Sequence, residues 1–150
     1  MIKPLLSSGL LVLLAALPPS QALLNARPGT SDIQAPFEGT VFYELSDESF
    51  AFTGQMHVTS RVTPKGPISI RVNLDGVSGI GEEKGIRYNV VGRDEVTAPF
   101  ATSITGDFDF SIVPADGFVL SCILRVRLGL TFSASGNLTD VNIVQLTVVH

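Results

Sequence analysis

Residues 118–132 decide the fold class, and they read FVLSCILRVRLGLTF. Every second residue from Phe118 to Phe132 is apolar, whereas Arg125 and Arg127 fall on the opposite face. This alternation is typical of a β-strand with one buried face. A strand of this length would extend for about 50 Å, so we expect it to bend or bulge near Gly129.

The same period of two recurs along most of the chain. Gly92 interrupts the fourth segment, and the last one changes phase between Ile143 and Val144. No segment carries an apolar stripe with the 3.6-residue period of a helix. We therefore predict an all-β domain whose other strands lie at 37–45, 55–62, 68–75, 85–96, 104–112 and 138–149.

One hairpin follows from matching apolar faces across a turn. Residues 63–66 read Thr-Pro-Lys-Gly, which suits a type I turn. Placing Val62 opposite Ile68 sets Val58 opposite Val72, so that both buried faces agree.

A second hairpin is expected around residues 114–117, which read Pro-Ala-Asp-Gly. Ile112 then lies opposite Phe118. In this register Asp107 is diagonal to Arg125, within reach of a cross-strand ion pair.

About seven strands joined by short turns predict an antiparallel β-sandwich. A small closed β-barrel is the alternative, and the alternation of residues does not separate the two.

The first 22 residues have the pattern of a targeting segment rather than that of a folded domain. A cationic start at Lys3 precedes the apolar run 10–17, and small residues end the segment at Ala22. These are the three parts of a secretory signal peptide, with an uncleaved anchor as the alternative. We predict cleavage after Ala22, a flexible leader at 23–36 and a single all-β domain at 37–150.

Export would place the chain outside the cell or in the periplasm. After cleavage of the signal peptide, we do not expect an integral membrane protein. The single cysteine, Cys122, excludes an internal disulfide. Because a free exposed thiol is a hazard in an oxidising compartment, we expect Cys122 to be buried.

Composition excludes several classes of function. The chain has 150 residues, of which 45% are hydrophobic and 16% charged, and this is not the composition of a disordered protein. A net charge of -4 argues against nucleic acid as a partner.

The motifs that imitate chemical sites are all incomplete. Residues 71–82 match part of a calcium loop, but Arg71 stands where the first ligand should be. The glycine cluster 76–85 lacks the Gly-Lys-Ser/Thr of a phosphate loop, and Ser78 lacks the glycines of a nucleophile elbow. We therefore expect no catalytic residue, metal or cofactor.

Adjacent carboxylates occur in pairs at 47–48, 82–83 and 94–95, and we expect these pairs in solvated turns. A facing pair with aromatic platforms, as glycosidases need, is not evident in a chain without tryptophan. Asn137 begins a glycosylation sequon, which has meaning only in a eukaryote.

The segments His57–Arg61, Arg71–Gly79 and Gly85–Tyr88 are similar to uncharacterised exported bacterial β-proteins. The resemblance covers about a quarter of the chain. It implies export and a β fold, and it carries no activity and no site residue.

The sequence favours a non-enzymatic module that binds through its surface to a protein or an envelope component. The surface-contact candidates are the outward residues His57, Arg125 and Arg127. The alternative is a small barrel that carries an apolar molecule, and a hydrolase is a distant third. In the carrier, the cavity would be lined by Phe108, Phe110, Phe118 and Phe132.

Overall fold

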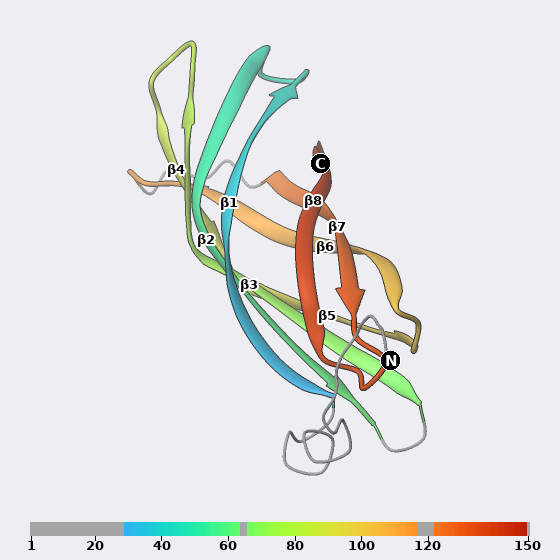
Figure 1. Ribbon diagram of the computed structural model, residues 1–150. Coiled ribbons are helices and arrows are strands. Elements are labelled where there is room, and N and C mark those ends of the chain that lie inside the picture. The colour runs from blue at the N-terminus through green and yellow to red at the C-terminus, as the bar shows by residue number, and fades with distance from the viewer. Residues whose placement is uncertain (1–28, 64–65, 117–121, 150) are drawn as a thin grey trace, which may run out of the picture.

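The computed structural model describes residues 29–63, 66–116 and 122–149, and these residues contain eight strands (Figure 1). The strands are β1 (Thr30–Tyr43), β2 (Glu48–Val62), β3 (Pro67–Gly81), β4 (Arg87–Val91), β5 (Arg93–Pro99), β6 (Ser103–Pro114), β7 (Cys122–Phe132) and β8 (Leu138–Val149).

All eight strands belong to one antiparallel sheet with the order β1-β2-β3-β4-β6-β7-β8, and β5 pairs with β3. The all-β class is confirmed. A single curved sheet is the arrangement of a small β-barrel, the alternative to the expected β-sandwich. β4 and β5 both lie beside β3, separated by Gly92, whose φ of 109° turns the chain between them. The expected interruption at Gly92 is therefore confirmed, and the sheet has seven positions along its path.

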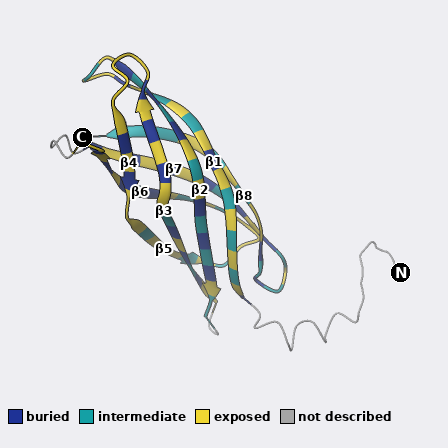
Figure 2. Cartoon of the chain, turned by 90° about the vertical axis from the view of Figure 1, so that its left-hand side faces the viewer, coloured by how far each residue is buried: buried dark blue, intermediate teal, exposed yellow. Residues whose placement is uncertain are grey.

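The sheet is nearly closed, because its first and last strands lie side by side (Figures 1 and 2). The backbone N–H of Leu138 donates to Ser31 Oγ at 2.8 Å, and Gly39 lies against the side chain of Leu146. In both contacts the residue of β8 lies 107 positions after the residue of β1. The residue numbers therefore increase together along the seam, so β1 and β8 run in the same direction. Within the described residues no ladder of paired residues joins them. We call this junction the seam.

The concave side of the sheet holds the core, and exposed and buried residues alternate along the strands (Figure 2). Burial of each large apolar side chain contributes about 1.5–3 kcal/mol. Cys122 is 2% exposed, which confirms that its thiol is buried. The largest fully buried side chains are Phe37, Phe50, Phe52, Met56, Ile68, Ile70, Leu74, Phe108, Ile112, Leu124, Leu128 and Leu130.

The register predicted for the first hairpin is confirmed. Val62 pairs with Ile68 and Val58 with Val72, and the Gly66 N–H donates to the Thr63 carbonyl at 3.0 Å. Beyond His57 the register shifts at a β-bulge, because two residues of β3 lie opposite Met56.

The register predicted for the second hairpin is wrong by four residues. Ile112 pairs with Cys122 rather than with Phe118, because the connection is longer than the four-residue turn that we expected. A shift by an even number keeps the same residues on the buried face, so the pattern of burial was right while the pairing was not.

The expected start of the domain and the expected position of the bulge also need correction. β1 begins at Thr30, so residues 30–36, which we expected in a flexible leader, belong to the sheet. The phase change between Ile143 and Val144 is confirmed as a register shift in the pairing of β7 with β8. Register shifts flank Gly129 as expected, but the extra residues, Val144 and Thr139, lie in β8 instead of β7.

The expected signal peptide (1–22), the leader residues 23–28 and the segment 117–121, which includes Phe118, lie outside the described residues. Within the described ranges, the chain forms no helix with the length and hydropathy that a membrane span needs.

Candidate interaction surface

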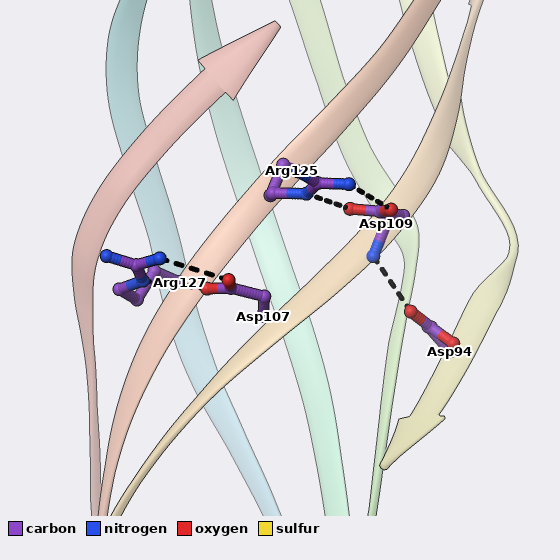
Figure 3. Close-up of polar contacts among 5 residues, drawn as sticks. All are labelled: Asp94, Asp107, Asp109, Arg125 and Arg127. Atoms are coloured by element: carbon purple, nitrogen blue, oxygen red, sulfur yellow. Dashed lines mark hydrogen bonds and ion pairs between the residues drawn. The ribbon is translucent and has the colours of Figure 1, made fainter. Parts of the chain in front are cut away.

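Arg125 and Arg127 lie on the outer face of β7, where each forms a bidentate ion pair with an aspartate of β6 (Figure 3). Arg125 contacts Asp109 through N–O distances of 2.8 and 2.9 Å, and Arg127 contacts Asp107 at 2.7 and 3.0 Å. The expected diagonal pair between Asp107 and Arg125 is therefore corrected to two directly opposed pairs.

These pairs change the acid–base properties of all four side chains. Hydrogen bonding to Arg127 lowers the pKa of Asp107, and hydrogen bonding to Arg125 lowers the pKa of Asp109. In turn, the aspartates raise the pKa of Arg125 and Arg127. Because each guanidinium already holds a carboxylate in its most favourable geometry, neither arginine is a free cation for an anionic partner.

Asp94 of β5 extends this polar cluster across a gap in the sheet. β5 does not pair with β6, and the Asp94 carboxylate instead accepts a hydrogen bond from the Asp109 backbone N–H at 2.9 Å (Figure 3). The prediction that Asp94 and Glu95 lie in a solvated turn is wrong, since both belong to β5.

His57 lies on the outer face of β2 and contacts the Asp32 carboxylate of β1 through Nε2. The Asp32 side chain is largely exposed, and the His57 side chain is partly exposed. Within the described residues no hydroxyl or thiol group hydrogen-bonds to this pair, so a nucleophile does not accompany it. His57 is on β2 and the two arginines are on β7, so the three candidates do not form one site.

A shallow polar groove of about 280 Å³ lies beside His57, over β1, β2, β3 and β5. On its floor Glu95 accepts hydrogen bonds from Ser69 and from Arg71, whose Nη2 is at 3.3 Å. These two donors lower the pKa of Glu95. Arg71 and Glu95 of this groove are therefore paired with each other, and Asp32 is paired with His57, whereas Arg61, which also lines the groove, forms no ion pair with the described residues.

Glu48 is a buried carboxylate that the sequence did not reveal. We expected it in a turn, but it begins β2 with 1% exposure and packs over Gly81, where any Cβ would overlap its carboxylate. Its Oε2 accepts a hydrogen bond from the Lys84 backbone N–H at 3.0 Å. Burial and the nearby Glu48 raise the pKa of Tyr88, whose ring packs edge-on against Phe50 at 4.9 Å.

The incomplete motifs lie in extended structure. Residues 71–81 of the partial calcium loop belong to β3, so they cannot wrap around an ion, and Asp75 instead accepts a hydrogen bond from the Gly92 N–H at 2.9 Å. Ser78 lies on the outer face of β3. Across the described ranges, no three side chains of His, Cys, Asp or Glu are grouped as metal ligands.

The seam differs from these paired surfaces because it opens towards one end. At its lower end in Figure 1 it is held by side chains, and the Gly29 N–H donates to Asn137 Oδ1 at 3.2 Å. At its upper end a groove of about 350 Å³ separates residues 41–45 from residues 146–148. Phe42 and Leu45 are 54% and 66% exposed there. The upper seam thus combines apolar side chains with two sheet edges.

Comparisons with protein-family models, with curated proteins and with solved structures find no match to this chain.

Proposed function

We propose that this chain is an exported, non-enzymatic β-protein that works as a binding module, with the upper seam as its contact surface. The observation that carries this proposal is the groove between β1 and β8, where Phe42 and Leu45 remain exposed. Exposed apolar side chains that gather beside an open sheet edge are typical of protein-binding sites.

The other candidate surfaces support the choice of the upper seam, because their charged side chains already form ion pairs. Arg125 and Arg127 are each satisfied by an aspartate, and His57 contacts Asp32. A partner that used these groups would have to displace an existing ion pair. At the seam, a partner could cover the exposed apolar side chains of Phe42 and Leu45, which form no ion pairs.

Export rests on the sequence of residues 1–22 and is part of the proposal. If the signal peptide is removed after Ala22, the protein recovered outside the cytoplasm begins at Leu23. Intact-mass measurement of the exported protein tests this directly, and a mass that includes residues 1–22 contradicts cleavage.

The contact surface is tested by photo-crosslinking in the native host. A photoreactive amino acid replaces Leu45 at the seam or, as a matched control, Ile86, which is an exposed apolar residue of another turn. We expect a discrete crosslinked product from position 45 and none from position 86. Equal products from both positions, or none from position 45, would contradict the proposal.

The alternative function, transport of an apolar molecule, would use Phe108, Phe110 and Phe132, which are all buried in the core cluster. Native mass spectrometry of the gently purified protein separates the two functions. An added mass that is lost on denaturation favours the carrier, whereas protein at its calculated mass favours the binding module.

A further inference from the structure

The topology of the sheet specifies the direction of a strand that would complete it. The sheet path has seven positions, which is an odd number, so an up-and-down order brings the first and last strands together in parallel. β1 and β8 therefore cannot close the sheet with the antiparallel pairing that all its other neighbours use. One further strand that runs in the opposite direction would be antiparallel to both.

We propose that the upper seam binds an extended segment of a partner protein, which pairs antiparallel with both β1 and β8. This proposal rests on the proposed function and adds the kind of partner. Strand addition uses backbone hydrogen bonds for affinity and the alternating side chains for specificity. The groove is lined by strand residues 41–43 of β1 and 146–148 of β8, so the paired part of the segment would be about three residues, or about 10 Å at about 3.3 Å per residue.

The side chains of the groove determine which residues the segment should carry on one face. Val41, Leu146 and Val148 are partly buried and pack against the core. A segment between them would place every second side chain over the same core. We therefore expect apolar residues, such as valine, at alternate positions of the partner segment.

The charge of the seam determines which residues the partner segment should carry on its outward face. The upper seam, residues 41–47 and 144–149, contains the acidic residues Glu44 and Asp47 and no lysine or arginine. Glu44 lines the groove itself. The outward positions of the partner segment should therefore carry lysine or arginine, because complementary charge both steers and selects a partner.

The test uses synthetic peptides with the full chain as purified from its host. The probe is the peptide KVKVKVK, and the controls are EVEVEVE, which reverses the charge, and KKKKVVV, which keeps the composition without alternation. We expect KVKVKVK to bind at least about tenfold more tightly than either control. Equal binding of KVKVKVK and KKKKVVV would overturn the proposal, because a general attraction of charge does not need alternation.

A charge-reversed variant locates the site. Glu44→Lys should weaken binding of KVKVKVK by about tenfold, whereas Glu83→Lys, the same change at an exposed turn residue away from the groove, should weaken it less than about threefold. Both residues are exposed, and circular dichroism checks that each variant is folded. Equal losses in the two variants would overturn the assignment to the seam.

Hydrogen exchange shows whether the peptide pairs as a strand. Binding should slow the exchange of amides in both 41–43 and 146–148, and protection of one strand only, or of other strands, would overturn pairing with both edges.

If crosslinking from position 45 persists but no peptide binds, the contact surface stands and strand addition fails. If both are absent, the proposed function fails as well. Binding that needs prior removal of the residues before Gly29 would identify this chain itself as the occupant and overturn the choice of a partner.

Discussion

Gly39 of β1 lies directly beneath Leu146 of β8, so closely that a Cβ at position 39 would be 2.5 Å from Leu146 Cδ1. The two strands that flank the seam approach each other here without sharing a ladder. The missing side chain of Gly39 therefore allows the sheet to close part of its circumference through packing alone.

Replacing Gly39 with valine should push the two strands apart. We expect Gly39→Val to lower the free energy of unfolding by about 1–3 kcal/mol, which is typical of overpacking. In a Leu146→Ala background the same change should cost less than half as much, because the overlapping atoms are gone. Urea unfolding of the four proteins measures this coupling, and strictly additive effects would show that the strands do not touch.

Gly54 is a more demanding position than the other glycines of the sheet. It has a φ of 148°, and an added Cβ would lie 2.2 Å from the Gly76 carbonyl oxygen, which is backbone and cannot rotate away. We expect Gly54→Ala to cost about 2–4 kcal/mol of stability. Gly92 has a φ of 109° but open space around it, so Gly92→Ala should cost about 1–2 kcal/mol. Urea denaturation compares the two, and a larger loss at position 92 would contradict this ranking.

The alternation of residues could predict which side chains are buried, but it could not place every strand against its neighbour. Shifting β7 by four residues leaves Cys122, Leu124 and Val126 on the buried face, so the apolar pattern accepts both registers. The positions of the charged residues on the outer face distinguish the two registers. Only in the observed register are both Arg125 and Arg127 opposite an aspartate, and that criterion would have selected it.

The seam was beyond prediction from local patterns, because it depends on the whole sheet. Whether β1 meets β8 follows from the number of strands and from their twist, and neither is encoded in one segment. The burial of Glu48 is hidden for a similar reason. Its partners, Gly81 and Lys84, lie on another hairpin, and the sequence around Glu48 reads as an ordinary acidic turn.

The Cys122 thiol should be unreactive in the folded protein. Burial raises its pKa above the ordinary value, so that at neutral pH the reactive thiolate is scarce as well as shielded. We expect 5,5′-dithiobis(2-nitrobenzoic acid) to label it at a rate set by protein unfolding. Labelling in urea should be complete within the mixing time, and equally fast labelling in native buffer would show that the thiol is accessible.

The two aspartate–arginine pairs should contribute to the acid dependence of stability. The pKa values of Asp107 and Asp109 are lowered in the folded state, so their contribution is fully present above the unfolded pKa near 3.8 and is lost as the pH falls through the folded values. The double variant Asp107→Asn/Asp109→Asn should therefore be less stable than the parent at pH 6, and the difference should shrink towards pH 2. Thermal unfolding across this range measures the difference in stability, and salt should reduce that difference because the pairs are exposed.

Glu83→Gln, at an exposed turn residue with no ion pair among the described residues, is the control. A gap that stays constant with pH in the double variant would show that the amides disturb packing rather than remove charge.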